Sequence, residues 1–202
     1  QEVIDDNPID KPLIKGMANE IEKTTDRIAK IVYGLRLFSR DGSNDFFHPI
    51  SVYQLIEETL SLCNERFKNN GVQIIVDPIR SDLSFEGRAT EISQVLINLL
   101  NNAYDAVADL KYKWIKISAI EKPDLMEIQV TDSGRRVPLH IQEKMFQPFF
   151  TTKAIEKGTG LGLSISTRII REHHGELRFD SHCPNTRFLI RLPKKQRILE
   201  AA

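Results

Sequence analysis

The sequence has few cysteines, no net charge and no long apolar run. Its two cysteines, Cys63 and Cys183, have neither a CxxC partner nor a histidine at a ligand spacing, so neither a disulfide framework nor a metal site is supported and a reducing, cytoplasmic compartment is favoured. Lys and Arg number 28 and Asp and Glu 28, so no overall field favours nucleic acid or an anionic membrane surface. No apolar run approaches the ~20 residues that cross a bilayer, and we expect no membrane contact within this chain.

The length and composition are those of one folded domain with an additional segment. The chain has 202 residues, of which 41% are hydrophobic and 28% charged, enough to fill a sizeable core. Of ten glycines, Gly158, Gly160 and Gly162 fall within one short stretch. Such a cluster indicates a backbone that must approach something closely.

A heptad pattern over residues 13–39 predicts one long helix, which Asp41-Gly42 ends. The apolar seam consists of Ile14, Met17, Ile21, Ile28, Ile31, Leu35 and Phe38. The helix could lie on its own globular domain, or it could belong to a bundle or coiled coil whose partner helix is missing or comes from another chain. The length of the seam, more than three heptads, favours the second interpretation.

After the break at residues 42–44 the pattern changes to mixed α and β. Ser51 can cap a helix that stops at residues 69–71, and a second long helix covers residues 89–108. The remaining predicted elements are strands at 72–77, 83–86, 114–120, 125–131, 176–180 and 187–192, a loop-rich stretch at 132–158 and a helix at 161–173.

Two stretches carry polar groups suited to ligand binding. Asn98 and Asn102 are four apart on the predicted helix, so both carboxamides share one side, and an amide oxygen is a suitable Mg²⁺ ligand. Alone, the pair could equally be two surface asparagines. Asp132-Ser133-Gly134 follows a strand, where the acid can accept a hydrogen bond from a ligand near the backbone, although this is also a common turn.

Two further stretches follow in order. Residues 146–153, with three phenylalanines and then Thr151-Thr152-Lys153, are either a hydrophobic plug that pins a loop or a lid that carries Thr and Lys to a ligand. Residues 158–164, Gly-Thr-Gly-Leu-Gly-Leu-Ser, open a helix, where close backbone amides and the helix dipole favour phosphate. Their spacing differs from both Walker and Rossmann loops.

Together these stretches resemble the ATP-binding domain of bacterial sensor histidine kinases, the Bergerat or GHKL nucleotide fold. Residues 97–106 are similar to the N box, Asp132-Ser133-Gly134 to the start of the first glycine box, residues 146–153 to the F box and residues 158–164 to the second glycine box. The resemblance implies an α+β fold, a two-layer α/β sandwich with helices on one face of a mixed sheet, preceded by a long helix. The long helix resembles the second helix of the family's dimerisation and phosphoacceptor hairpin.

The resemblance implies that ATP and Mg²⁺ are bound between the helices and the sheet. Asn102 would be the metal ligand, Asp132 would meet the adenine amino group, and Lys153 and the glycine-rich amides would meet the phosphates. Asn98, Asn102 and Lys153 form the implied catalytic set. The implied nucleotide-binding residues are Asn98, Asn102, Asp105, Asp132, Gly134, Thr152, Lys153, Gly158, Thr159, Gly160, Leu161, Gly162, Leu163 and Thr186.

The chain departs from the family pattern in two places. No histidine is followed by the acid and Asn-Pro of the phosphoacceptor motif, and His48, His140, His173, His174 and His182 each fit a structural role, the pair at 173 and 174 where a helix dipole favours them. We therefore expect a fragment that begins within the hairpin. The second departure is Arg136, where the first glycine box continues with glycine; a positive φ there would cost arginine about 1–2 kcal/mol.

The leading hypothesis is the catalytic core of a histidine kinase, which phosphorylates a histidine that then supplies the aspartate of a response regulator's receiver domain. The expected divisions are a partial dimerisation and phosphotransfer region at 1–42, an ATP-binding domain at 46–193 and a tail at 194–202. The intact protein is expected to form a homodimer through the hairpin. The alternatives are a binding module degenerate at Arg136, and an ATPase; the Hsp90, gyrase and MutL types carry glutamate at the position of Asn98, where an amide cannot take water's proton.

Overall fold

The computed structural model describes residues 11–39, 46–153 and 158–196, and the chain divides into two units between Asp41 and Gly42. The first unit contains one helix, α1 (Lys11–Ser39), where the heptad pattern predicts it. Its apolar seam is open to solvent as far as the side chains are described, with Ile14, Met17 and Ile21 each 52–65% exposed. The side chains of Ile31, Leu35 and Phe38, and the predicted break at 42–44, lie outside the described residues. No described helix is long and apolar enough to cross a membrane.

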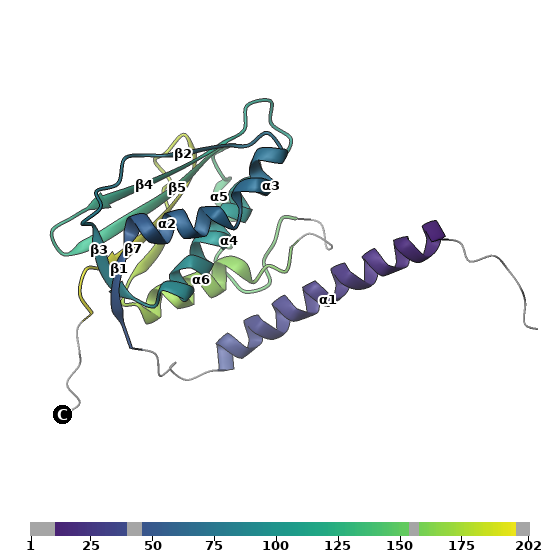
Figure 1. Ribbon diagram of the computed structural model, residues 1–202, viewed down its shortest axis with the longest axis horizontal. Helices are drawn as coiled ribbons and strands as arrows, with labels where there is room; N and C mark the ends of the chain where they lie inside the picture. Colours follow the sequence, from purple (N-terminus) through teal and green to yellow (C-terminus); the bar gives the residue numbers. More distant parts are fainter. Residues whose placement is uncertain (1–10, 40–45, 154–157, 197–202) are drawn as a thin grey trace, which may run out of the picture. The chain divides into compact units, whose positions relative to one another are not determined.

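The second unit is built on a five-stranded mixed sheet of order β2-β4-β5-β7-β6 (Figure 1). β2 runs parallel to β4 and the other neighbours are antiparallel. The strands are β2 (Gln73–Val76), β4 (Trp114–Glu121), β5 (Leu125–Arg135), β6 (Glu176–Phe179) and β7 (Asn185–Pro193).

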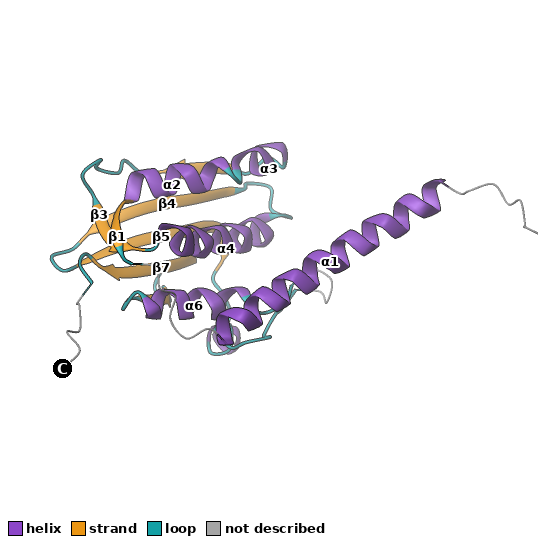
Figure 2. Cartoon of the chain, turned by 60° about the horizontal axis from the view of Figure 1, so that its bottom comes forward, coloured by secondary structure: helices purple, strands orange, loops and turns teal. Residues whose placement is uncertain are grey.

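Helices cover one face of this sheet (Figure 2). They are α2 (Val52–Ser61), α3 (Asn64–Asn69), α4 (Ala89–Val107) and α6 (Gly162–Glu172), and the short α5 (Leu139–Gln142) lies between β5 and α6 in the chain. The helical residues Ile92, Leu96 and Leu99 and the strand residues Ile128 and Ile190 are at most 1% exposed, and α4 packs against β5. Buried and more exposed residues alternate over the first half of β4, whereas β5 and β7 contain runs of three buried residues. The two-residue repeat of a strand puts Met126, Ile128 and Val130 of β5 on one buried face. The expected two-layer α+β sandwich is confirmed.

The structure corrects two predicted elements. The helix expected from Ser51 to residue 69 is broken into α2 and α3, although Ser51 does cap α2, its Oγ accepting from the Gln54 N–H. The apolar spacing fits a continuous helix across the break, so periodicity could not reveal it. The sequence also misses β1 (His48–Ser51), which pairs with β3 (Ser84–Gly87) in a separate two-stranded sheet. Pro49 within such a short segment hides the strand pattern.

β5 runs further than expected and is irregular at its end. The predicted strand stops at Thr131, before the turn-like Asp-Ser-Gly sequence, but β5 continues to Arg135. Thr131 pairs with Arg187 and Arg135 with Asn185, so between these two pairs β5 has two more residues than β7. Such a bulge bends the strand and redirects side chains. Asp132 thus lies within a sheet strand, opposite Ile115 of β4, and not in a turn after one.

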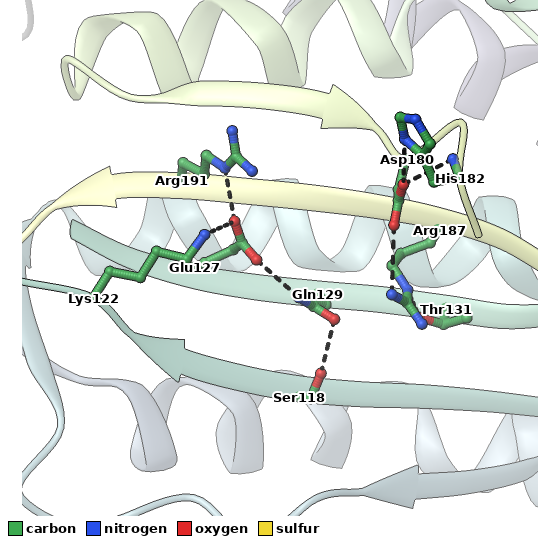
Figure 3. Close-up of polar contacts among 9 residues, drawn as sticks. All are labelled: Ser118, Lys122, Glu127, Gln129, Thr131, Asp180, His182, Arg187 and Arg191. Carbon is green, nitrogen blue, oxygen red and sulfur yellow. Dashed lines mark hydrogen bonds and ion pairs between the residues drawn. The ribbon is translucent and has the colours of Figure 1, made fainter.

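A buried carboxylate anchors the face of the sheet opposite the helices (Figure 3). Glu127 of β5 is 3% exposed. Its oxygens accept from Lys122 Nζ at 2.9 Å, Arg191 Nε at 2.7 Å and Gln129 Nε2 at 2.8 Å. Although burial alone raises the pKa of Glu127, these three donors lower it to about 2. The carboxylate therefore joins β5 to β7 in its charged form.

We expect Glu127→Gln to destabilise the second unit by roughly 1–3 kcal/mol at pH 7, because the amide cannot satisfy two cations. The loss of stability should be smaller than the lowered pKa of Glu127 alone implies, because Lys122 is partly exposed and water screens its charge. A folded-state pKa below the ordinary 4.5 stabilises the fold above that pH, and this stabilisation is lost as the pH falls toward 2. Urea unfolding at pH 7 and at pH 3.5 measures the difference between variant and parent, which should shrink at the lower pH.

The matched control is Glu121→Gln. Glu121 also accepts from two cations, Lys194 at 2.6 Å and Arg80 at 3.0 Å, but its side chain is 36% exposed. Solvated pairs of this kind contribute little, so the control should shift the urea midpoint much less. An equal shift in both variants would show that burial of Glu127 is not what makes its pairing important.

Candidate functional site

The two asparagines predicted to bind a ligand lie on α4, beside its apolar side. α4 has neither proline nor glycine between residues 89 and 107, and its buried residues recur at spacings of three and four. This pattern fixes which side of the helix meets the sheet and α6. Asn98 and Asn102 are partly buried at the border of that side. Because α4 is continuous through both positions, the i,i+4 spacing puts them on the same side of the helix.

Asn98 joins α4 to the start of α6. Its Nδ2 donates to Ser166 Oγ at 2.9 Å. A Cβ added at Gly162, the first residue of α6, would collide with the Asn98 side chain. A side chain at position 162 would therefore displace the Asn98 amide from the position in which it donates to Ser166.

Asn102 contacts Lys153, a residue far along the chain. Lys153 Nζ donates to Asn102 Oδ1 at 3.0 Å and forms an ion pair with Asp105 Oδ2 at 2.6 Å. The Lys153 backbone N–H donates to Thr151 Oγ1 at 3.1 Å. Three residues that the resemblance assigns to the nucleotide are thus brought together at one edge of α4.

The glycine-rich segment before α6 packs tightly against residues 149–153. A Cβ at Gly158 would lie 2.6 Å from Thr151 Oγ1, and Gly160, at φ +68°, would place a Cβ against the Phe149 backbone. α6 has Leu161 as its N-cap with no side-chain capping bond, and the Leu161 N–H donates to Thr159 Oγ1 at 3.4 Å. Among the described residues no side chain caps the first-turn N–H groups of α6, which is the arrangement that suits an anion. Leu161 is buried, while Thr159 and Leu163 are partly exposed.

A second group of predicted residues meets where β5 and β7 lie side by side. Asp132 Oδ1 accepts from the Gly134 N–H at 2.7 Å, and Thr186 Oγ1 donates to the Arg135 carbonyl at 2.9 Å. A Cβ at Gly134 would lie 2.5 Å from Asp132 Oδ1 and 3.6 Å from Thr186 Oγ1. Glycine leaves the room in which Asp132 makes this bond, and the bulge in β5 brings the three residues together.

Asp132 is a buried carboxylate, 2% exposed. Burial raises the pKa of Asp132 to about 6, and the Gly134 N–H opposes this rise. Within the described part of the chain, no cation pairs with Asp132 and no donor reaches its Oδ2. Burying a carboxylate without a cationic partner costs free energy, and a carboxylate in this condition is typical of a binding site.

The phenylalanine-rich segment combines features of the two interpretations. Phe146 packs edge-on against Phe188 of β7, with ring centroids 6.4 Å apart, and so acts as the hydrophobic plug. Phe149, by contrast, is 64% exposed and has φ 65°. Thr152 is exposed and joins none of the contacts described above. Residues 154–157 lie outside the described residues.

Arg136 does not carry the strain that would argue for a degenerate site. Among the described non-glycine residues only Phe149 and His174 have positive φ. Arg136 lies just past the end of β5 with an exposed side chain. The cost of a positive φ is therefore not incurred at Arg136.

His173 is structural, but not for the reason expected. It is fully buried, accepts from the Arg88 N–H through Nε2 at 3.0 Å and places Nδ1 2.8 Å from the Ile169 carbonyl. Burial lowers the pKa of His173, so the ring is neutral at pH 7. A favourable helix dipole acting on a charged imidazole, as expected from its position, does not apply.

The donor set at α4 fits a nucleotide-bound magnesium better than a protein-only metal site. Among the described residues, no cluster of three His, Cys, Asp or Glu side chains could hold a metal. Asn102 Oδ1, however, already accepts a cationic ammonium, so its lone pairs are aimed at positive charge. One protein oxygen completed by phosphate oxygens is a common way to hold Mg²⁺.

Sequence reasoning missed two residues of this group, Ser166 and Thr151. Ser164 and Ser166 are buried polar residues on a helix with a strong apolar side. Buried hydroxyls need partners, and this signal could have pointed to the Asn98 contact. Thr151 stands next to the assigned Thr152, but nothing in the sequence distinguishes which threonine faces Lys153.

A sequence profile described as "Histidine kinase-, DNA gyrase B-, and HSP90-like ATPase" matches residues 87–196. The chain is 33% identical over 172 residues to the two-component sensor PprA of Pseudomonas aeruginosa, covering 83% of this chain and 18% of PprA. It is 37% identical over 175 residues to the signal transduction histidine-protein kinase AtoS of Escherichia coli, covering 84% of this chain and 27% of AtoS. The chain thus spans about a quarter or less of these relatives.

Solved structures show the same architecture. The nucleotide-free catalytic domain of the histidine kinase ThkA is 34% identical, with a TM-score of 0.67 that covers 74% of this chain and 99% of that domain. A complex of ThkA with the response regulator protein TrrA contains a chain that is 28% identical, with a TM-score of 0.71, covering 95% of this chain and 53% of that one.

Proposed function

Because this chain belongs to the family of histidine kinase-, DNA gyrase B- and HSP90-like ATPases, we propose that it is the ATP-binding catalytic core of a sensor histidine kinase. In this proposal the γ-phosphoryl group of ATP passes to a histidine outside these residues and from there to the aspartate of a receiver domain. α1 supplies the second helix of a dimerising hairpin, and its exposed apolar seam supports that assignment.

In this proposal, the amide of Asn98 favours transfer of the phosphoryl group to a protein over hydrolysis of ATP. Asn98 is held by Ser166 and by the approach of Gly162. An amide cannot accept a proton from an attacking water. A site that orients ATP without such a base is suited to a nucleophile brought by a protein segment, with positioning and electrostatics as the sources of rate.

Each end of the site has a distinct task in this proposal. The free oxygen of Asp132 accepts from the adenine amino group, and Gly134 and Thr186 shape the surroundings of the base. Lys153 and the amides of residues 160–163 hold the phosphates. Asn102 would hold Mg²⁺ together with the phosphate oxygens, and this ion would neutralise part of their charge.

The proposal is tested by mixing the chain with γ-labelled ATP and a separately supplied phosphoacceptor hairpin from a sensor kinase. We expect label on the hairpin histidine, stable to base and labile to acid, and little inorganic phosphate. Steady-state phosphate release without labelled protein would identify an ATPase instead. Absence of ATP binding by calorimetry would reject both activities.

We expect Asn102→Ala to abolish the dependence of ATP binding on Mg²⁺. Loss of one ligand bond to a charged group corresponds to about a tenfold or larger change in affinity. Calorimetry with and without Mg²⁺ measures this change. Asn101→Ala is the control, because Asn101 accepts from Arg66 at 3.2 Å on another side of α4. A variant at position 102 that still responds to Mg²⁺ like the parent would remove Asn102 from the metal site.

A further inference from the structure

Lys153, assigned to the phosphates in the proposed function, contacts two side chains of α4, and one of them, Asn102, is assigned to Mg²⁺. Its Nζ lies 2.6 Å from Asp105 Oδ2 and 3.0 Å from Asn102 Oδ1. Asn102 and Asp105 are three residues apart on α4, so one ammonium reaches both. The side chains of Lys153 and Asp105 are 31% and 38% exposed, which leaves the pair accessible to a competing ligand. We call Lys153, Asn102 and Asp105 the lysine latch.

The latch occupies two positions that bound nucleotide needs. The Asn102 oxygen, expected to face a cation bound to the phosphates, is occupied by the ammonium. Lys153, expected to face the phosphates themselves, is neutralised by Asp105. Asp105 also presents negative charge to any phosphate that enters, and like charges at this range repel. The same carboxylate therefore opposes phosphate binding in two ways.

Building on the proposed function, we infer that Asp105 restrains Lys153 in the nucleotide-free protein and is not itself a nucleotide contact. A ligand that brings both a divalent cation and a polyphosphate opens the latch, because the cation replaces the ammonium at Asn102 while the phosphates replace Asp105 at Lys153. A nucleoside without phosphates offers neither replacement. Asp105 thus lowers the affinity for phosphate-bearing nucleotides and leaves the affinity for nucleosides unaffected.

Calorimetry with MgATP and with adenosine tests this role. Asp105→Asn is expected to tighten MgATP binding roughly two- to fivefold, the range of a partly exposed ion pair, and to leave adenosine binding unchanged. In a Lys153→Gln background the same substitution should have no further effect on MgATP. Asp109→Asn is the control for loss of one negative charge near the end of α4, and should leave both affinities unchanged.

Three results would overturn the latch. Weaker MgATP binding by Asp105→Asn would make Asp105 a direct contact. Equal tightening in the Lys153→Gln background, or by Asp109→Asn, would reduce the effect to general charge. Additive effects of the Lys153 and Asp105 substitutions on urea unfolding of the nucleotide-free chain would show that the pair is not coupled. Failure of the parent chain to bind ATP at all rejects the proposed function itself, and it is seen before any variant is compared.

Discussion

Asp132→Asn is expected to weaken ATP binding ten- to hundredfold and, at the same time, to stabilise the folded second unit above pH 6. The binding loss follows from the geometry of the carboxylate. Oδ1 accepts from the Gly134 N–H, so a carboxamide would keep its oxygen there and turn its NH₂ toward the adenine amino group. A hydrogen bond to a charged acceptor contributes ~1.5–3 kcal/mol. This bond is lost in the variant, because the carboxamide NH₂ and the adenine amino group are both donors.

The gain in stability follows from the cost of burying the charge. The pKa of Asp132 rises from 3.8 to about 6, and one pKa unit corresponds to about 1.4 kcal/mol. Because the folded-state pKa is the higher one, the stabilisation that Asp132 contributes is present below pH 3.8 and is lost as the pH rises through about 6. The neutral variant should therefore match the parent near pH 4 and exceed it by up to about 3 kcal/mol at pH 8.

Urea unfolding at pH 4 and pH 8, with calorimetry at both, measures the two effects. Asp180→Asn is the contrasting control, because Asp180 has a cationic partner and Asp132 does not. Asp180 accepts from Arg187 at 3.4 Å. A variant at position 132 that binds ATP like the parent would remove Asp132 from the site. Equal stability of variant and parent at pH 8 would mean that the buried carboxylate carries no unfavourable charge.

The parent's own affinity should also fall as the pH drops below 6. Protonation of Asp132 replaces a charged acceptor by a neutral carboxyl group, which accepts more weakly. ATP phosphates titrate in the same range, so the comparison is made against Asp132→Asn, which lacks this component. A difference between parent and variant that stays constant from pH 5 to pH 8 would contradict the assignment.

Gly160→Ala is expected to lower ATP affinity by more than tenfold. Gly160 has φ +68°, where a side chain costs about 1 kcal/mol, and the added Cβ would collide with the Phe149 backbone. Backbone atoms cannot rotate away, so the segment before α6 must shift. That shift moves the amides expected at the phosphates, and misplaced donors lose most of their value.

Gly71→Ala separates the two causes. Gly71 has φ +71°, yet nothing lies within 4 Å of its added Cβ. The control should therefore lose about 1 kcal/mol of stability and keep its nucleotide affinity. If calorimetry gives the two variants the same affinity, the contact between Gly160 and Phe149 does not position the phosphate end.

The elements with strong periodicity were predictable because burial of one helix or strand face repeats along the sequence. α4 begins at Ala89 as expected and ends within one residue of the predicted boundary. The break between α2 and α3 and the strand β1 were not predictable. The first keeps the apolar spacing of a continuous helix, and the second is a four-residue strand that includes Pro49.

Arg136 and His173 show how local rules fail when the backbone is unknown. A glycine expected from the family pattern suggested strain at Arg136, but φ there is not positive. The position of His173 at a helix end suggested a charged ring, but complete burial keeps it neutral. Both errors concern quantities, φ and burial, that depend on packing by distant segments.

By itself, the sequence determined the family resemblance, the mixed α and β class and the residues worth examining, because glycine spacing, amide spacing and apolar periodicity are local properties. Only the tertiary structure decided which of those residues meet. Lys153 reaches Asn102 and Asp105 from 51 and 48 positions away, and Thr186 approaches Gly134 because β7 pairs with β5. Such contacts follow from the packing of whole elements, which no short stretch of sequence encodes.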